Sequence, residues 1–217
     1  MFIALEGLDA AGKRTQATLL YDRLRSQNRP VELWDFPTYD TTFGSLVAAY
    51  LRGDYGPKEV LPPEVPSLLY ELDRYQHMKR MKAQLAAGTV LVANRYISSN
   101  LGFQGAKFSG PDQRMFLAWL KAVESRLPQP DMTIFLDVPA EAAAGLAVKR
   151  PERAHMHGQK LDIHEADVDY QARVRQTYLE IARSEGWIVI SCMKDGALRP
   201  PEDIHEEIWG HVSKRLR

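Results

Sequence analysis

Two glycines and a lysine near the start of the chain have the spacing of a loop that binds phosphate groups. Gly7 and Gly12 enclose four residues, and Lys13 follows at once. Such glycines let the backbone turn its N–H groups towards phosphate oxygens, and the lysine adds positive charge at the β and γ phosphates. The whole loop comprises Gly7, Leu8, Asp9, Ala10, Ala11, Gly12, Lys13, Arg14 and Thr15. We therefore expect it to hold the phosphates of a nucleotide.

One position of this loop departs from the usual pattern. The residue after the lysine normally supplies a hydroxyl group to a magnesium ion, and here it is Arg14. A hydroxyl group comes one residue later, at Thr15. Thr15 and the carboxylate of Asp9 are therefore the side chains of the loop that could contact magnesium or its waters.

The rest of the chain alternates short apolar runs, rich in β-branched and aromatic residues, with longer helical patterns. The runs are Phe2 to Leu5, Val31 to Trp34, Thr89 to Ala93, Met132 to Val138 and Trp187 to Ser191. This alternation predicts the α/β class, with a five-stranded parallel sheet flanked by helices. In one helix, apolar residues recur every three or four positions and predict a single buried stripe. The stripe consists of Leu68, Leu72, Tyr75, Met78, Met81 and Leu85.

A polar and basic segment, Lys149 to Lys160, separates two helical patterns in the last third of the chain. It has no apolar periodicity. We interpret it as an exposed, mobile lid over about residues 149–161. The length of 217 residues suits a single domain, residues 1–217, that includes this lid.

The overall charge and the cysteine content exclude some classes of protein. The 28 Lys and Arg residues balance 28 Asp and Glu residues, so no general positive field exists to hold a nucleic acid or an anionic membrane. The one cysteine, Cys192, excludes an intrachain disulfide and fits a reducing compartment. The start of the chain lacks a signal peptide and a span-length apolar segment. We expect a cytoplasmic protein that binds neither nucleic acid nor membrane.

Six stretches of the chain are distinctive in their order and spacing. They are Glu6 to Gln16, Asp35 to Tyr39, Leu68 to Arg74, Asn94 to Gly105, Leu127 to Asp131 and Leu161 to Glu165. In their order and spacing they resemble the thymidylate kinase family, and the resemblance covers nearly the whole chain. It implies the P-loop nucleoside monophosphate kinase fold with a mobile lid, and ATP-dependent phosphorylation of dTMP to dTDP with Mg²⁺. It also implies a homodimer that packs helices including Pro111 to Leu127 and part of the Tyr70 helix.

The resemblance assigns the phosphate and sugar of the acceptor to residues at the ends of the strands. Arg95 would pair with the 5′-phosphate through charge-assisted hydrogen bonds, and the hydroxyl group of Tyr39 would donate to the same phosphate. Asp9 would accept a hydrogen bond from the sugar 3′-hydroxyl group or hold a magnesium-bound water. Phe103 would lie against the sugar and leave too little space for an extra 2′-hydroxyl group.

The base would lie against two helices. By resemblance Tyr70 stacks on it and Arg74 donates to a base carbonyl, and because these residues are four apart they share a helix face apart from the apolar stripe. Asn100 carries a donor and an acceptor, which match N3–H and the adjacent carbonyl of a pyrimidine. The full substrate-binding set is Asp9, Phe36, Tyr39, Tyr70, Arg74, Arg95, Ser99, Asn100, Phe103 and Gln104.

The resemblance also assigns catalytic positive charge to the lid. Some members of the family place an arginine where this chain has Ala10, so Arg150 or Arg153 would supply the transition-state cation. The full catalytic set is Lys13, Asp9, Arg95, Arg150 and Arg153.

Asn94 leaves an alternative open. It stands where the Asp-Arg-Tyr motif of the family begins with a carboxylate that helps to hold magnesium water, and with Asp9 and Thr15 it completes the expected metal set. An amide oxygen still orients a metal-bound water, so we expect activity with an elevated magnesium requirement that Asn94→Asp lowers. The alternatives are a weakened or silenced nucleotide-binding protein of this fold, a kinase for another nucleoside monophosphate, and a GTPase, whose Asn-Lys-x-Asp sequence is missing here.

Overall fold

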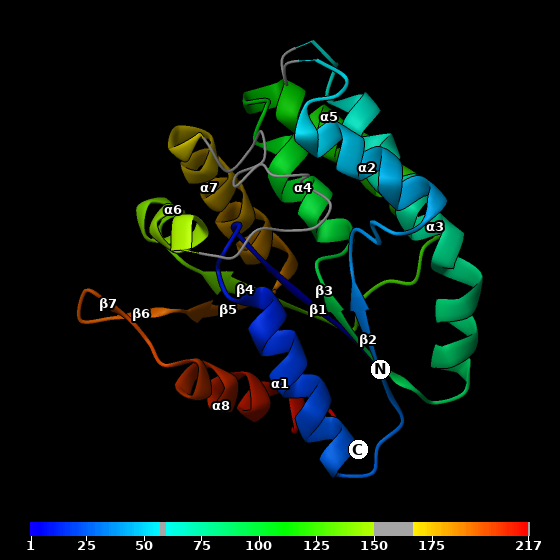
Figure 1. Cartoon of the computed structure of the whole chain (residues 1–217), viewed down its shortest axis with the longest axis vertical. Helices are drawn as coiled ribbons and strands as arrows, with labels where there is room; N and C mark the ends of the chain where they lie inside the picture. Colours follow the sequence, from blue (N-terminus) through cyan, green and yellow to red (C-terminus); the bar gives the residue numbers. More distant parts are fainter. Residues whose placement is uncertain (57–59, 150–166, 217) are drawn as a thin grey trace.

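A parallel sheet of five strands forms the centre of the molecule, in the order β2-β3-β1-β4-β5 (Figure 1). The computed structural model describes residues 1–56, 60–149 and 167–216. The strands are β1 (Phe2–Gly7), β2 (Val31–Asp35), β3 (Val90–Asn94), β4 (Met132–Asp137) and β5 (Ile188–Ser191). All five expected strands are confirmed, with ends that shift by one or two residues. The three inner strands, β3, β1 and β4, are mostly apolar because helices cover both faces of the sheet.

Eight helices and one small hairpin complete the described part of the chain. The helices are α1 (Lys13–Ser26), α2 (Thr42–Arg52), α3 (Glu64–Ala86), α4 (Ile97–Gly105), α5 (Gly110–Glu124), α6 (Ala140–Lys149), α7 (Val168–Glu185) and α8 (Pro201–Val212). The hairpin pairs β6 (Met193–Lys194) with β7 (Ala197–Leu198). Helices α1 and α8 pack together on one face of the sheet, while α3, α4 and α7 pack on the other (Figure 1).

The order of the strands creates a crevice at the carboxyl ends of the central ones. Strand β1 lies between β3 and β4. After β1 the chain enters α1 on one face of the sheet, and after β3 it enters α4 on the other. Because the two loops leave in opposite directions, they open the crevice in which ligands of open α/β sheets bind. Most of the expected site residues follow β1, β2 and β3, so they meet at this edge.

The prediction of a buried apolar stripe along α3 is correct for only one half of the helix. In the second half of the helix Met81 is buried, and Tyr75, Met78 and Leu85 pack against the core beside it. In the first half Leu68 is 43% exposed and Leu72 is 41% exposed. The buried positions there are Pro66, Ser67, Glu71, Asp73 and Arg74.

The reason for this difference is that the two halves of α3 have different neighbours. The second half packs on the sheet, where an apolar surface is stable. The first half lies between α2, through Leu69 and Tyr70, and α4, through Ser67. Its inward side chains therefore face polar groups rather than the sheet.

The expected lid lies outside the described residues, except for Lys149, which ends α6. Arg150 and Arg153 fall in the same undescribed segment. Within the described ranges, no helix has both the length and the apolar character needed to cross a membrane.

Candidate active site

The loop between β1 and α1 has the backbone of a phosphate-binding loop. A side chain at Gly7 would bring a Cβ atom to 2.9 Å from the backbone oxygen of Leu136, so only glycine fits there. Ala10 and Gly12 have positive φ angles of 58° and 82°, which turn successive N–H groups inward. In the described part of the chain no side chain caps the amino terminus of α1. Its first N–H groups are thus available to an anion.

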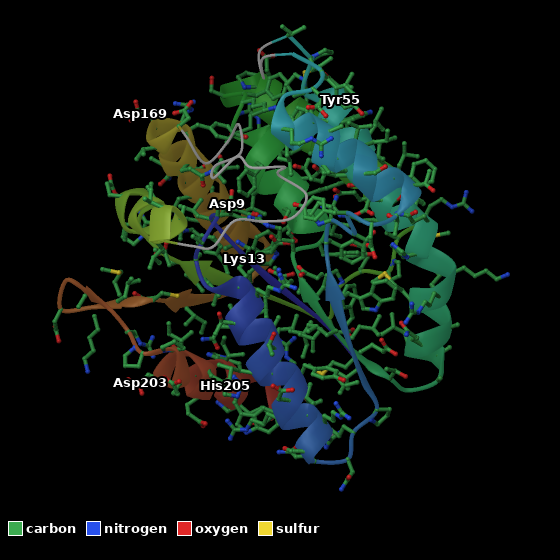
Figure 2. The ribbon with its side chains drawn as sticks, in the orientation of Figure 1. Asp9, Lys13, Tyr55, Asp169, Asp203 and His205 are labelled. Atoms are coloured by element: carbon green, nitrogen blue, oxygen red, sulfur yellow. The ribbon has the colours of Figure 1, made fainter. Side chains whose placement is uncertain are left out.

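Lys13 is the first residue of α1 and points into the loop (Figure 2). Its side chain is only 6% exposed. The ammonium group donates to the backbone oxygen of Leu8 at 2.5 Å, which holds the charge at the centre of the loop. A buried, positioned ammonium group is what the electrostatic stabilisation of a transferring phosphate requires.

A cleft of about 1490 Å³ runs along this edge of the sheet. This volume is larger than the several hundred Å³ that suit one small ligand. Of the expected site residues it is lined by Asp9, Ala10, Ala11, Gly12, Lys13, Arg14, Thr15, Phe36, Tyr39, Tyr70, Arg74, Asn94, Arg95, Ser99, Asn100, Phe103 and Gln104. Gly7 and Leu8 are buried and do not line it. The structure therefore brings all the other described members of the set to one cleft.

Arg95 and Asp9 form an ion pair in the cleft, with the guanidinium 2.5 Å from the carboxylate. The backbone of Arg95 has a φ of 65°, an uncommon conformation for a bulky residue that is often kept at functional sites. Its guanidinium group lies 5.0 Å above the ring of Phe103. Burial opposes the charge, but Asp9, with Tyr178 and Glu6, raises the pKa of Arg95 above its usual value. Arg95 is thus a permanent cation, already oriented towards the loop.

Glu6, a fully buried residue to which the sequence analysis assigned no role, organises the start of α4. One carboxylate oxygen accepts from the backbone N–H of Tyr96 at 2.8 Å. The other accepts from the hydroxyl groups of Ser99, at 2.6 Å, and Tyr178, at 3.0 Å. The hydroxyl group of Ser99 is therefore directed at Glu6, although Ser99 lines the cleft. A glutamate inside an apolar strand is the signal that could have revealed this role.

Arg74 lies at the far end of the cleft in a buried cluster with two glutamates. It is 2% exposed, it pairs with Glu71, and its guanidinium lies 3.9 Å from Glu124. Burial opposes the charge, yet Glu71 and Glu124 outweigh it and raise the pKa of Arg74. Burial and the nearby Glu71 also raise the pKa of Glu124 well above its usual value. The cluster thus favours the protonated form of Glu124 beside a single cation.

The side chain of Asn100 is tied to this cluster. Its amide nitrogen donates to Glu71 at 2.7 Å and to the backbone oxygen of Ser67 at 3.2 Å. Both amide hydrogens are used, so in this arrangement only the oxygen of Asn100 can serve a base. The expected donor role of Asn100 does not fit the structure, because α3 and α4 pack so closely that Glu71 takes the donor.

Several buried polar atoms at this end have no hydrogen-bond partner among the described residues. They include Nε of Arg74 and both amide atoms of Gln104. Leaving such groups unsatisfied costs about 1–3 kcal/mol each. Since both residues line the cleft, a planar ligand with donors and acceptors on its edge would satisfy them.

Aromatic side chains form the walls of the cleft. The ring of Tyr70 lies 5.9 Å from the guanidinium group of Arg74. Phe36 is buried between Trp34, whose ring stacks on it at 5.8 Å, and Tyr96. Tyr39 follows in a loop that Asp73 holds by accepting from the backbone N–H of Thr38 at 3.1 Å. These contacts give the walls a defined position.

The opposite end of the cleft is built from the hairpin and the start of α8. Its lining includes Cys192, Leu198, Arg199, Pro201 and Ile204. Arg199 is fixed by Glu207 and by the backbone oxygen of Ser191, each at 2.6 Å. Burial raises the pKa of the Cys192 thiol to about 12, so Cys192 is an inert, buried residue. Sequence reasoning missed Arg199 and Pro201, which carry no motif.

The expected metal residues suit a magnesium ion that is bound largely through phosphates. Asp9, Thr15 and Asn94 all line the cleft. The side-chain oxygen of Asn94 is buried and has no hydrogen-bond partner among the described residues. No cluster of three or more His, Cys, Asp or Glu side chains suited to a metal occurs in the described ranges. The donors present are thus one carboxylate, one hydroxyl and one amide oxygen, and Mg²⁺ commonly takes few protein ligands plus waters and substrate phosphates.

Comparison with known proteins gives a consistent result. The family described as thymidylate kinase matches residues 5–208. A thymidylate kinase of Arabidopsis thaliana is 33% identical over 87% of this chain and 64% of its own length. A thymidylate kinase of Plasmodium falciparum is 30% identical over 98% of this chain and 90% of its own. A solved thymidylate kinase structure from Candida albicans superimposes with a TM-score of 0.75 at 25% identity, covering 99% of this chain and 91% of that one.

Proposed function

The chain belongs to the thymidylate kinase family and transfers the γ-phosphoryl group of ATP to dTMP, and we propose how the residues of its cleft divide this work. The proposal rests chiefly on one observation. The ion pair of Arg95 and Asp9 joins the phosphate-binding loop to the segment just before α4, the helix that carries Asn100 and Gln104 of the base end. Donor and acceptor phosphates would therefore meet at this pair.

The phosphate-binding loop and Lys13 hold the phosphates of ATP. Phosphoryl transfer needs little covalent help from a protein, so the rate comes from positioning and from charge placed on the transferring group. The backbone N–H groups of the loop and the ammonium of Lys13 supply both. The hairpin, Arg199 and Pro201 then border the adenine.

Arg95 binds the 5′-phosphate of dTMP, assisted by the hydroxyl group of Tyr39. On binding, the phosphate takes over donors of Arg95 that now point at Asp9, and the carboxylate of Asp9 turns to the sugar 3′-hydroxyl group or to a magnesium water. Phe103, beneath Arg95, limits the space at the 2′ position of the sugar.

The thymine base binds at the buried cluster. The oxygen of Asn100 accepts from N3–H, Nε of Arg74 donates to a base carbonyl, and the amide of Gln104 supplies a further donor and acceptor. Tyr70 stacks on the ring. The buried polar atoms that have no partner in the described structure support this arrangement, because a pyrimidine with two carbonyls satisfies them.

Asp9, Thr15 and Asn94 are the residues that would hold the Mg²⁺ of ATP, or its waters. The ion would neutralise charge on the β and γ phosphates. Arg150 or Arg153 adds a cation from the lid. In a variant with both arginines replaced by alanine, kcat should fall more than the KM for ATP rises, and an unchanged kcat would contradict this role.

The protein acts as a homodimer in the cytoplasm. Val65, Leu68 and Leu72 form an exposed apolar stripe on α3, and Met115 on α5 is 71% exposed, which suits helix packing about a twofold axis. Light scattering at micromolar concentration should give twice the mass of the chain. A monomer mass would contradict the proposal.

The experiment that tests the activity is a phosphoryl-transfer assay over a panel of nucleoside monophosphates, with and without magnesium. We expect dTMP to be the best acceptor, dUMP slower and purine monophosphates poor. Equal turnover of AMP and dTMP would remove the assignment of the acceptor.

A further inference from the structure

Asn94 ends β3 directly beside Asp35, which ends β2. The two residues are Cα partners in the parallel ladder. The amide nitrogen of Asn94 lies 2.5 Å from a carboxylate oxygen of Asp35. Both residues line the cleft. An acidic side chain therefore stands one strand away from the position at which the family motif has its carboxylate.

This contact determines which way the amide group of Asn94 points. An ionised carboxylate can only accept hydrogen bonds, and an amide oxygen can only accept as well. The amide nitrogen of Asn94 must therefore face Asp35, and its oxygen must face away from it. That oxygen is buried and has no hydrogen-bond partner among the described residues.

Arg14 holds Asp35 from the other side. Its guanidinium lies 3.3 Å from the second carboxylate oxygen of Asp35. The side chain of Arg14 is largely exposed, so this ion pair adds little stability. It does keep the carboxylate in place for Asn94. The two unusual residues of the sequence, Arg14 and Asn94, thus share one partner.

We infer that Asp35 is a positioning residue, which orients Asn94 so that its side-chain oxygen takes the place of the missing carboxylate oxygen. That oxygen then accepts a hydrogen bond from a water of the magnesium ion that accompanies ATP. The inference rests on the proposed function of the cleft. It means that the magnesium site depends on Asp35, which is not among the expected metal residues.

The inference changes the expected effect of Asn94→Asp. This substitution alone would place a second carboxylate against Asp35, and two like charges at this distance disfavour each other. The single substitution is therefore not expected to lower the magnesium requirement. The combination Asp35→Asn with Asn94→Asp exchanges the two side chains and restores one donor facing one carboxylate.

The test is isothermal titration calorimetry with a non-hydrolysable ATP analogue, with and without Mg²⁺. The quantity measured is the factor by which Mg²⁺ strengthens binding of the analogue. For Asp35→Asn, whose new amide allows Asn94 to turn either way, we expect this factor to fall about threefold to tenfold, because one oriented oxygen contact is worth roughly 1 kcal/mol. Asn94→Asp should lower it too, and the double variant should recover at least the natural value.

A matched control is Asp22→Asn, an exposed carboxylate on α1 that does not line the cleft. It should leave the magnesium factor unchanged. Because the factor compares binding of the analogue with and without Mg²⁺ in the same variant, a change that weakens both equally cancels out of it, which separates loss of the metal contact from a damaged fold. An unchanged factor in Asp35→Asn, or losses that simply add in the double variant, would overturn the inference.

The outcomes also separate this inference from the proposed function. A natural protein that phosphorylates dTMP but binds the analogue equally well with and without Mg²⁺ would overturn the inference alone. A natural protein with a large magnesium factor and no turnover of any monophosphate would overturn the proposed activity. The role of Asp35 would then still be supported by the calorimetric comparison of the single and double variants.

Discussion

At the phosphate end of the cleft the binding groups belong mainly to the backbone, whereas at the base end they belong to buried side chains. The phosphate end consists of a turn with positive φ angles at Ala10 and Gly12, and one buried ammonium group, that of Lys13. The base end consists of Arg74 between Glu71 and Glu124, with Gln104 unsatisfied nearby. A site made from the backbone tolerates side-chain changes such as Arg14. A site made from buried charged side chains is disrupted when any one of those side chains is replaced.

The two ends also differ in how deeply their side chains are buried. At the phosphate end the side chains of Asp9, Ala10, Arg14 and Thr15 are exposed or partly exposed. At the base end two carboxyl groups share one cation away from water. Removing one partner of such a buried set typically costs about 3–5 kcal/mol. Substitutions at the phosphate end should therefore alter rate, and those at the base end should alter stability and acceptor use together.

The largest expected effect is that of Lys13→Ala. Loss of a positioned charge on the transferring phosphoryl group typically costs about 3 kcal/mol or more, so kcat should fall at least about a hundredfold. The melting temperature should change little. Steady-state kinetics with Lys79→Ala, an exposed lysine on α3, provides the control. A fall in kcat of less than about threefold would contradict the assignment of the loop.

Arg74→Ala should have the next largest effect and should act on the acceptor. We expect kcat/KM for dTMP to fall by about tenfold to a hundredfold, in line with a lost charged hydrogen bond of roughly 1.5–3 kcal/mol, while the KM for ATP stays the same. The folded protein should also be less stable, because Glu71 loses its buried cation. Arg114→Ala, on the exposed side of α5, is the matched control. If the use of ATP and the use of dTMP were weakened equally, Arg74 would not act on the acceptor alone. The proposed division between a phosphate end and a base end would then be wrong.

Gln104→Met separates stability from acceptor use at the base end. The substitution keeps the size of the side chain and removes a buried amide that has no partner in the described structure. The melting temperature should therefore rise, by about 2–4 °C if roughly 1 kcal/mol is recovered. Use of dTMP should fall by about tenfold. Thermal unfolding and kinetics on the same samples check both, and a variant that loses stability would show that the amide is satisfied in the free protein.

The smallest expected effect is a change in the pH dependence of stability in Glu124→Gln. Burial and Glu71 raise the pKa of Glu124 in the folded state, so the folded protein holds a proton that the unfolded chain releases. Stability is therefore lost as pH rises through the folded-state pKa. Glutamine resembles the protonated form at every pH, so the variant should match the natural protein near pH 4.5 and melt about 2 °C higher at pH 8.

The control for this experiment is Glu180→Gln on the exposed face of α7. Its melting temperature should track that of the natural protein at both pH values. A Glu124→Gln variant that melts lower at pH 8 would show that Glu124 is ionised and pairs with Arg74.

Much of the fold and of the phosphate end follows from the sequence alone. The five strands and the loop were predictable because each is continuous in the chain: an apolar run, two glycines at a set spacing and a lysine are read within a few residues. The motifs of the family add the base end by resemblance, and every described residue of that set lines the cleft.

Only the tertiary structure decided what those side chains do with one another. Glu6 meets Tyr96 across 90 residues, and Asp35 meets Asn94 across 59. Periodicity does not encode such pairs, because it reports which face of an element is apolar and not which element will cover that face. For the same reason Leu68 and Leu72 belong to an apolar pattern but lie exposed, while Glu71 and Arg74 are buried. The sequence determined the elements and the residue types at the cleft, and packing between distant elements determined which of those residues are oriented, paired or left for a ligand.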